Sequence, residues 1–411
     1  MVDIPRHIPN IAIVLSLLMI NDGVTYLKEK QGIQLIVQTT QACNLRCRHC
    51  YESDQEYPTA IMSDEVLERI IYLAMKDYQK VDFLWFGGEP LLAGLSFFEK
   101  IVAYQKKYQS GHEIKNHVQT NATLLDDDFA CFFKENDFGV SISFDGKYND
   151  VLRQKSEETV NGIETCKRHG IRPAVLSVIH AENYWHQYEM YRDFAEKELP
   201  CKFNRIFQEG CVKKNKQLLI SNEDFIAAEK EFFKKWADDE RGRDISTFNI
   251  CFASLYDLKR KECLFTGCLF KWLSFSPTGE VYTCPRFIGT EYVFGNVFEK
   301  EALHEFFLTD KYRELTEKAI VRRKSCKEKC ALYQFCNGGC NAQCVHRDGL
   351  EFANSDLCDY VKNFFPFVAE QMYLLLKQDS ARNPYIKDFL KKHKEKVESV
   401  YQYFVDNLLI K

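Results

Sequence analysis

From residue 33 onward, short apolar runs alternate with longer stretches whose apolar residues recur at the helical period. Such runs are typical of buried strands, and such stretches are typical of helices that cover a sheet. The predicted strands are 33–39, 82–86, 114–119, 139–144, 172–179 and 202–207, and the predicted helices are 63–79, 94–109, 125–137, 156–169, 184–198 and 221–240. Six β/α units predict a parallel sheet, open or closed, with chemistry at the carboxyl ends of its strands.

The ends of the chain follow other patterns. The apolar run 11–20 is shorter than the roughly 17–25 residues of a membrane-spanning helix, and we interpret it as a strand that turns at 21–23 into a second strand over 24–28. The tail from Tyr360 is predicted to be helical with a break at 381–384, and its Lys-rich stretch 387–396 to be a solvated face. In the first β/α unit, Ser63 is the expected N-cap, with Asp64 and Glu65 in the first turn.

The length of 411 residues exceeds the roughly 250–300 at which single cores stop growing, so we expect two domains or a barrel with a large appendage. The 55 Lys and Arg residues are interspersed with 59 Asp and Glu, giving a net charge of −4. This balance does not favour nucleic acid as a partner. The chain shows no targeting or membrane-spanning segment, so we expect a cytoplasmic protein without a membrane partner. Its oligomeric state is not indicated.

The chain contains 17 cysteines, which in a long chain without a targeting signal favour metal binding in a reducing cytosol over disulfides. Three of them, Cys43, Cys47 and Cys50, lie in the loop after the first predicted strand. Iron–sulfur clusters are usually held by four cysteines, so a group of three leaves one iron without a protein ligand. The alternative is a set of thiols that bind no metal.

The spacing C-x3-C-x2-C resembles the signature of the radical S-adenosylmethionine (SAM) enzymes. The resemblance implies a [4Fe–4S] cluster whose open iron is chelated by the amino and carboxylate groups of SAM. In that family, one electron from the cluster breaks a carbon–sulfur bond of SAM. Methionine and a 5′-deoxyadenosyl radical result, and the radical removes a hydrogen atom from the substrate.

The resemblance extends to residues that would contact SAM. Gly87-Gly88-Glu89, after the second strand, is similar to the family's G-G-E motif, which holds the SAM amino group. Ser143 and Arg153 match a serine and an arginine that contact SAM, and His49 takes a position that is often near the adenine. Three of these have an alternative: an ordinary β-turn for the Gly87-Gly88-Glu89 motif, a solvated surface charge for Arg153, and a histidine satisfied by backbone for His49.

The β/α alternation stops between residues 240 and 260, and cysteines return. Some surround a predicted hairpin over 275–282 with its turn at 277–279, and others form the spacing C-x3-C-x5-C-x3-C, expected in rigid loops. Zinc knuckles would also use such pairs. The region resembles the SPASM extension, which binds two auxiliary [4Fe–4S] clusters. Carried over, the first ligand set is Cys263, Cys268, Cys284 and Cys340, and the second is Cys326, Cys330, Cys336 and Cys358. Cys344 is a surplus thiol that could replace a neighbour. The chain would thus hold three [4Fe–4S] clusters.

The expected organisation is an N-terminal hairpin over 1–32, a partial (β/α)6 barrel over 33–240, a SPASM domain over 241–365 and a helical tail over 366–411. Many similar enzymes carry an N-terminal leader-binding domain, for which 32 residues leave no room. Recognition of a leader would then use the barrel mouth, the SPASM surface, the hairpin or a separate protein.

The overall layout most resembles the anaerobic sulfatase-maturating enzymes, which oxidise a cysteine or serine to formylglycine. Those enzymes use an aspartate directly after the distal cysteine of the hairpin as the proton acceptor, and here that position is Pro285. Proline has no titratable group. We therefore favour a sister activity, the crosslinking of side chains in a ribosomally made precursor peptide.

Two alternatives stay open at this point. One is sulfatase maturation with another base, for example Glu209, and the other is a non-catalytic iron–sulfur electron carrier. The resemblance implies two partners for an enzyme of either kind, a peptide substrate and a low-potential electron donor such as flavodoxin or ferredoxin.

Overall fold

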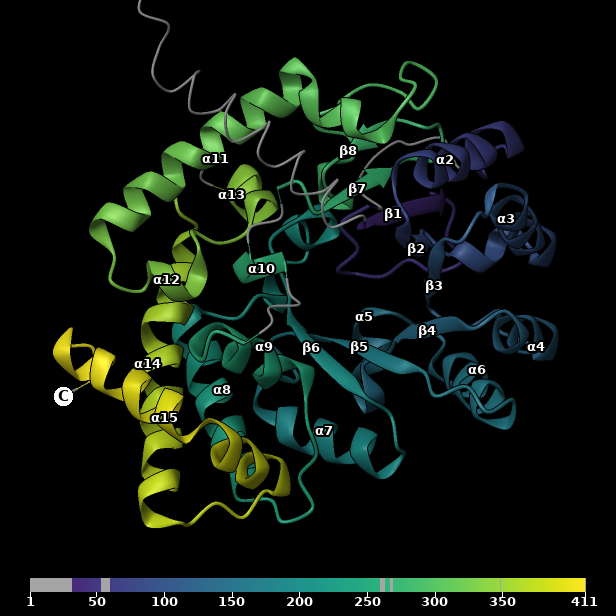
Figure 1. Cartoon of the computed structure of the whole chain (residues 1–411). Coiled ribbons are helices and arrows are strands. Elements are labelled where there is room, and N and C mark those ends of the chain that lie inside the picture. The colour runs from purple at the N-terminus through teal and green to yellow at the C-terminus, as the bar shows by residue number, and fades with distance from the viewer. Residues whose placement is uncertain (1–31, 53–59, 259–262, 267–268, 348, 411) are drawn as a thin grey trace, which may run out of the picture.

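Eight strands form one sheet in the order β6-β5-β4-β3-β2-β1-β7-β8 in the computed structural model of the chain, which Figure 1 shows. The structure describes residues 32–52, 60–258, 263–266, 269–347 and 349–410. The hairpin predicted over 11–28 lies outside these residues. Neighbouring strands from β6 to β1 all pair in parallel, as the six predicted β/α units require.

The predicted strands and helices are confirmed, with ends that shift by a few residues. The strands are β1 (Gly32–Thr40), β2 (Lys80–Gly87), β3 (Glu113–Thr120), β4 (Phe138–Ser143), β5 (Ala174–Ile179) and β6 (Cys201–Arg205). The helices that follow them are α2 (Asp64–Asp77), α3 (Leu95–Tyr108), α4 (Asp127–Glu135), α6 (Ser156–Arg168), α7 (Gln187–Glu196) and α8 (Asn222–Ala237). In Figure 1 these helices lie around the outside of the sheet.

The local sequence explains where the helix of the first β/α unit begins and which face it buries. Ser63 is the N-cap of α2, and its hydroxyl oxygen accepts a hydrogen bond of 3.4 Å from the backbone N–H of Val66. This bond satisfies one of the donors that a helix leaves open at its start. Leu67 and Ile70 lie on the buried face of the helix, against the buried side chains of the sheet. Burial of this apolar face fixes α2 on the sheet.

The predicted hairpin consists of β7 (Trp272–Phe275) and β8 (Val281–Tyr282), with Gly279 at positive φ in its turn. The sequence predicts this hairpin but not its place: β7 pairs in parallel with β1, with Val37 opposite Phe275. The barrel sheet and the cysteine-rich region therefore share one hydrogen-bonded ladder. Figure 1 shows the green β7 beside the purple β1.

The rest of the cysteine-rich region and the tail are helical. The helices are α9 (Ser246–Leu255), α10 (Cys263–Thr266), α11 (Asp310–Lys329), α12 (Tyr333–Cys336), α13 (Asn341–Arg347), α14 (Ser355–Gln378) and α15 (Pro384–Asp406). The loops expected around the second cysteine set are thus mostly helix ends: Cys326 lies in the last turn of α11 and Cys336 at the end of α12. The break predicted at 381–384 is confirmed, and α14 packs on α8 and α15.

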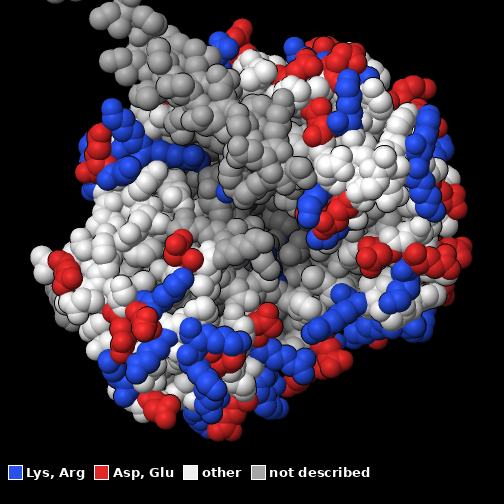
Figure 2. Space-filling view, in the orientation of Figure 1, with Lys and Arg blue, Asp and Glu red and all other residues white. Residues whose placement is uncertain are grey.

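Figure 2 shows charged side chains of both signs around a hollow near the centre of one face. The lysines of the stretch 387–396 are exposed, which confirms the predicted solvated face. Among the described residues, no helix is long and apolar enough to cross a membrane.

Candidate functional site

The loop after β1 gathers three thiols at the carboxyl end of the sheet. Cys43, Cys47 and Cys50 are each partly buried. Burial raises the pKa of Cys47 to about 12, and repulsion from the other two thiols adds to this rise. The pKa of Cys43 is also raised, again chiefly by burial. The three side chains therefore lie close enough to repel one another as thiolates, an arrangement that fits a shared positively charged metal centre.

The two glycines of the G-G-E motif allow β2 to approach this loop. The backbone N–H of Gly88 donates a 2.8 Å hydrogen bond to the carbonyl oxygen of Thr40, and that of Glu89 donates one of 2.8 Å to Ala42. A Cβ atom on Gly87 would lie 2.2 Å from the oxygen of Thr40, and one on Gly88 would lie 2.2 Å from that of Ala42. Only glycine fits at these positions. The glycines hold the start of the cysteine loop, which an ordinary β-turn does not explain.

Glu89 is fully buried and joins the ends of two strands. One carboxylate oxygen accepts bonds from Thr120 Oγ1 at 2.6 Å and from the N–H of Leu91 at 3.0 Å, and the other accepts one of 2.8 Å from the N–H of Asn121. Burial raises its pKa to about 7, against the effect of these donors. Three accepted bonds leave a carboxylate about one further lone-pair site. A bond from Glu89 to the SAM amino group stays a prediction.

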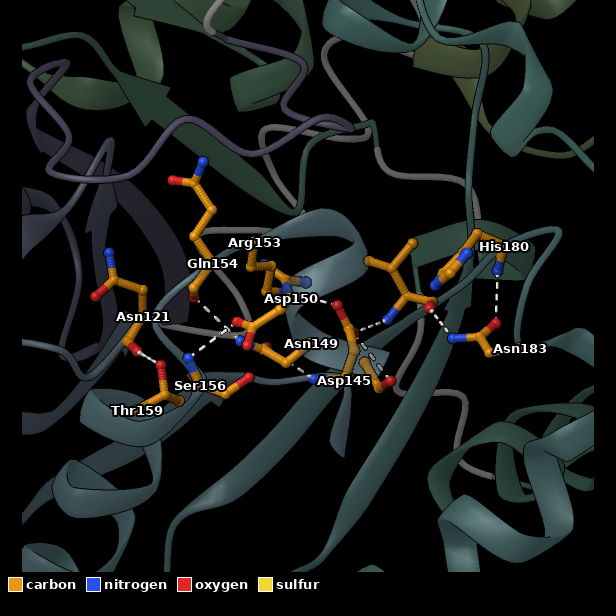
Figure 3. Close-up of polar contacts among 12 residues, drawn as sticks. Asn121, Asp145, Asn149, Asp150, Arg153, Gln154, Ser156, Thr159, His180 and Asn183 are labelled. Atoms are coloured by element: carbon orange, nitrogen blue, oxygen red, sulfur yellow. Dashed lines mark hydrogen bonds and ion pairs between the residues drawn. The ribbon is translucent and has the colours of Figure 1, made fainter. Parts of the chain in front are cut away.

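Arg153 is buried, so its interpretation as a solvated surface charge is wrong. Its Nε donates a 2.8 Å hydrogen bond to Asp145 Oδ2, as Figure 3 shows. The other oxygen of Asp145 accepts bonds from Ser177 Oγ at 3.0 Å and from the N–H of Val178 at 2.6 Å. The positive charge of Arg153 also lowers the pKa of Cys47. Arg153 therefore lies beside the cysteine loop, and its ion pair with Asp145 holds it in place.

Two histidines lie near Arg153 with unsatisfied ring nitrogens. His49 Nδ1 and His180 Nε2 are buried and have no hydrogen-bond partner among the described residues. Burial, and then the charges of Arg153 and His180, hold the pKa of His49 well below its usual range. His49 Nδ1 is thus not satisfied by backbone, which weakens the alternative interpretation of this residue. Ser143 ends β4 at the same edge of the sheet. Contacts of both residues with SAM stay predictions.

The four thiols of the second auxiliary set lie close together. They come from the ends of α11 and α12, the C-cap of α11 and the start of α14. Burial raises the pKa of Cys336 to about 11, and repulsion from Cys330, Cys358 and Cys326 raises it further. The pKa values of Cys326 and Cys358 are raised for the same two reasons. All four thiols thus act on one another, as a four-cysteine cluster requires. In the described part of the chain, no three His, Cys, Asp or Glu side chains form a site for a single metal ion.

The structure describes the side chains of two of the four proposed ligands of the first auxiliary set. Cys284 and Cys340 both lie near Arg286, whose pKa they help to raise. Cys268 lies outside the described residues, and the side chain of Cys263, in α10, is not described either. Cys344 is fully buried in α13. The ligands of this set, and the choice between Cys344 and a neighbour, stay predictions.

Three residues beside the cysteine loop were not singled out from the sequence. Tyr51 lies near the thiols of both Cys50 and Cys284, and its hydroxyl is hydrogen-bonded to Glu52. Gln38, on β1, donates a 3.0 Å bond from Nε2 to Glu52 Oε2. Burial raises the pKa of Glu52 to about 7, while both bonds lower it. A polar residue among the apolar residues of β1 was the available signal for Gln38.

Two cavities lie next to each other here and share part of their walls. The larger, of about 900 Å³, is lined by β6, the start of α8, Cys340 and the start of α14. The smaller, of about 80 Å³, is lined by Gln38, Tyr51, Glu52 and Pro285. Both share the lining residues Glu209, Lys213, Arg286 and His346. The shared residues thus lie between the larger cavity at β6 and the smaller one beside the cysteine loop.

Two family assignments match these regions. Residues 37–194 match the radical SAM superfamily, and residues 263–341 match the SPASM iron–sulfur cluster-binding domain. The matches contain the cysteine loop and most of the proposed auxiliary ligands, whereas Cys358 lies outside them. Both fall inside the domain boundaries expected above, which themselves stay predictions.

Relatives extend the similarity to almost the whole chain. A serine-type anaerobic sulfatase-maturating enzyme of Bacteroides thetaiotaomicron is 28% identical over 87% of this chain and 94% of its own length. A solved structure of anSMEcpe with bound AdoMet and Kp18Cys peptide is 28% identical, with a TM-score of 0.72 over 83% of this chain and 98% of that one. Streptococcus suis SuiB bound to the precursor peptide SuiA shares the fold, with a TM-score of 0.61 and 16% identity over 86% of this chain and 82% of that one.

Proposed function

The chain belongs to the radical SAM enzymes that carry a SPASM iron–sulfur domain, and from this premise we propose that it oxidatively modifies side chains of a peptide made by the ribosome. The two domains imply SAM and [4Fe–4S] clusters as cofactors. When bound, these groups supply a radical that takes one hydrogen atom from the substrate and an acceptor for the electron of a second hydrogen. The favoured product is a crosslink from a side-chain carbon to another carbon or to a heteroatom.

The chain offers ligands for each of these groups. Cys43, Cys47 and Cys50 would hold the cluster that binds SAM. Cys326, Cys330, Cys336 and Cys358 would hold one auxiliary cluster, because their thiols already converge. Cys284 and Cys340, with Cys263 and Cys268, would hold the other. Toward SAM, the proposed contacts are His49, Gly87, Gly88, Glu89, Ser143 and Arg153.

The observation that carries the proposal is the cavity of about 900 Å³ between β6 and the cysteine-rich helices. Its size exceeds what a single small side chain needs and lies within the range of ligand-binding pockets. It shares four lining residues with the small cavity beside the cysteine loop. A peptide lying in the large cavity could therefore extend one side chain toward the loop. This arrangement supports a peptide substrate rather than a non-catalytic electron carrier, which needs no such path.

Pro285 and its surroundings favour crosslinking over formylglycine formation. Proline cannot accept the proton that formylglycine formation releases. Glu209, the substitute considered above, is a member of the same cavity wall, but both of its oxygens bond to the guanidinium of Arg286. Two of its roughly four lone-pair sites are thus engaged by the N–H donors of Arg286. A crosslinking reaction also removes two hydrogens, one as a hydrogen atom and the other as an electron and a proton; this proton would pass to water or to a base beside the atoms that are joined, and not to position 285.

The proposal can be tested by coexpression. A short open reading frame next to this gene would be expressed together with the enzyme under anaerobic conditions, and the peptide would be analysed by tandem mass spectrometry. We expect a product that has lost two hydrogens and whose fragments show two residues joined. A peptide that always emerges unmodified, while the enzyme cleaves SAM, would contradict the proposal. We place the reaction in the cytoplasm and expect flavodoxin or ferredoxin as the reductant.

Sulfatase maturation is the second candidate, and the extent of the similarity favours it. The chain matches 94% of the length of the Bacteroides enzyme, which carries that activity in its name. Under this alternative, a carboxylate from another position of the chain would act as the base, because position 285 is proline. Incubation with a sulfatase-derived peptide that has a central cysteine distinguishes the two candidate functions, because only a sulfatase maturase would convert that cysteine to formylglycine.

A further inference from the structure

The wall of the large cavity carries more cations than acids. Its lining cations are Lys202, Arg205, Lys213, Lys216, Arg286 and Arg347. Its lining carboxylates are Glu209, Glu229 and Asp356, of which Glu209 is paired with Arg286 and Asp356 with Arg347. Burial raises the pKa of Glu229 to about 7, which weakens its negative charge near neutral pH. The wall therefore keeps an excess of positive charge.

Arg205, at the end of β6, is a partly buried member of this wall. Its guanidinium donates bonds of 2.6 Å to Asn222 Oδ1 and to the carbonyl oxygen of Ile220, and it packs 4.8 Å from the ring centre of Phe225. Both acceptors are neutral, and among the described residues no carboxylate forms an ion pair with this arginine. Burial, and then the charge of Arg347, lower the pKa of Arg205 to about 10. The cation is thus held in place but lacks a partner of opposite charge.

Two aspartates near Arg205 do not supply that partner. Asn222 Nδ2 donates to Asp356 at 2.7 Å and to Asp359 at 3.0 Å, so the amide of Asn222 links these carboxylates to the guanidinium. Asp356 is also paired with Arg347. A guanidinium has five N–H groups, and the two bonds of Arg205 leave three that can still donate.

Two lysines add to the positive charge. Lys213 and Lys216 lie in the segment after β6 and are exposed. Their amines have no hydrogen-bond or ion-pair partner within the described part of the chain. Lys213 also lines the small cavity beside the cysteine loop. Together with Arg205, these lysines are cations that a ligand in the large cavity can reach.

Arg286, in contrast, is engaged by groups of the protein. It bonds to Glu209, and it lies near the thiols of Cys284 and Cys340, which would be negative as cluster ligands. Its charge is therefore already compensated, and it is not one of the cations that we assign to a ligand.

We propose that Arg205, together with Lys213 and Lys216, binds a carboxylate of the peptide substrate in the large cavity. This carboxylate belongs to an aspartate or glutamate side chain or to the C-terminus of the peptide. Its two oxygens match the fork of the guanidinium, and partial burial beside Phe225 makes the bond stronger than it would be in water. The inference rests on the proposed function, because it assumes that a peptide occupies this cavity. It adds that the substrate is acidic where it lies against β6.

Binding of short probes tests this inference without turnover. The enzyme, reconstituted with iron and sulfide and supplied with SAM, would be dialysed anaerobically against three radiolabelled pentapeptides. These are acetyl-Gly-Ala-Glu-Ala-Gly-amide, acetyl-Gly-Ala-Gln-Ala-Gly-amide and acetyl-Gly-Ala-Gln-Ala-Gly with a free C-terminal carboxylate. Hydrogen bonds to a charged group correspond to about tenfold or more in affinity. We expect at least one carboxylate probe to bind about tenfold more tightly than the neutral probe, and the probe that does so identifies the source of the carboxylate.

Three variants make the test specific. Arg205→Gln should bring the affinities for the preferred and the neutral probe to within about threefold of each other, while binding of the neutral probe itself stays unchanged. A purely structural role of Arg205 would weaken the binding of both probes. Arg205→Lys keeps the charge without the fork and should retain part of the preference. The double variant Lys213→Gln, Lys216→Gln should reduce the preference by about threefold, since it removes two charges and no buried contact.

Arg168→Gln is the matched control. Arg168 is an exposed arginine of α6 that pairs with Asp127, and it does not line the cavity. This variant should keep the wild-type preference. Iron content and SAM affinity would be measured in every variant, and only variants that match the wild type in both would be compared. If Arg205→Gln does not match, the double lysine variant decides, and a preference that it keeps in full would overturn the inference.

The remaining outcomes separate this inference from the proposed function. Equal affinities of all three probes for the wild type, or no binding of any probe at millimolar concentration, would overturn the inference. So would a preference that a well-folded Arg205→Gln variant retains. A clear preference in an enzyme that modifies no peptide would support the inference and count against the proposed function. A modified peptide without any such preference would do the opposite.

Discussion

The guanidinium of Arg286 donates hydrogen bonds to both carboxylate oxygens of Glu209, one of them from Nε at 2.9 Å. Arg286 directly follows Pro285, and Glu209 comes from the segment after β6. Glu209, the carboxylate considered as a substitute base, is thus bonded to a cation that is itself held in place. This pair joins the barrel to the cysteine-rich region and engages the carboxylate of Glu209 with a positive charge.

Iron content tests the ligand sets. Three [4Fe–4S] clusters predict about twelve iron atoms per chain after anaerobic reconstitution. A variant with Cys43, Cys47 and Cys50 all changed to Ala should retain about eight, because the auxiliary ligands are untouched. The measurement is iron and sulfide analysis with visible absorption spectra. About four iron atoms in the parent protein would contradict the assignment of two auxiliary clusters.

SAM cleavage distinguishes the role of the cysteine loop from the role of the two auxiliary ligand sets. With a strong reductant, the enzyme should convert SAM to 5′-deoxyadenosine and methionine, and the triple variant of the loop should not. The double variant Cys326→Ala, Cys330→Ala is the matched control, since it should keep the cleavage but lose peptide modification. Chromatography of 5′-deoxyadenosine is the readout. Cleavage by the triple variant would show that the loop does not hold the reactive cluster.

The buried pair of Arg153 and Asp145 should matter for stability. Asp145→Ala leaves the guanidinium of Arg153 buried without its partner, and removing one member of a buried pair typically costs about 3–5 kcal/mol. We expect a loss of this size in the free energy of unfolding, measured by anaerobic denaturant titration. Glu113→Ala, which removes an exposed ion pair with Lys80, should cause no measurable loss. Equal losses in the free energy of unfolding for Asp145→Ala and Glu113→Ala would contradict a stabilising role of the buried ion pair.

Glu229 should make stability depend on pH. It is buried in α8 beside Tyr360 and Gln187, and burial raises its pKa from 4.5 to about 7. Below pH 4.5 both the folded and the unfolded chain keep this proton. As the pH rises to 7, the unfolded chain loses it first, so stability falls by roughly 3 kcal/mol from this group and then stays level.

Denaturation at pH 5 and at pH 8 measures this contribution. Glu229→Gln should lose less stability between the two values than the wild type does. Glu231→Gln, an exposed glutamate of the same helix, should behave like the wild type. An unchanged pH dependence in Glu229→Gln would show that this carboxyl is not the responsible group.

Much of the architecture could be predicted because it depends on local patterns. The alternation of apolar runs such as 33–39 with helical stretches fixed six β/α units, and Ser63 marked a helix start that the structure confirms. The resemblance to the SPASM extension assigned Cys358 to the second auxiliary set, and its thiol does lie near those of Cys326 and Cys330; that the set binds a cluster stays a prediction.

What could not be predicted depends on contacts between distant segments. The pairing of β7 with β1 joins residues more than 230 positions apart, as Val37 opposite Phe275 shows. The need for Gly87 and Gly88 arises from the approach of Thr40 and Ala42, which the motif alone does not reveal. Likewise, the cavity that Gln38, Glu52 and Pro285 share exists only after β1, the cysteine loop and the hairpin meet.

Two peptides given to one enzyme preparation distinguish crosslinking from formylglycine formation. The reduced, reconstituted enzyme with SAM would be incubated with a sulfatase-derived peptide that has a central cysteine and, separately, with the peptide encoded next to this gene. Tandem mass spectrometry would follow both. We predict that the first peptide gains no formylglycine, because Pro285 cannot take the proton, and that the second loses two hydrogens and keeps its backbone. Formylglycine in the first peptide, formed at a rate comparable to SAM cleavage, would contradict the account.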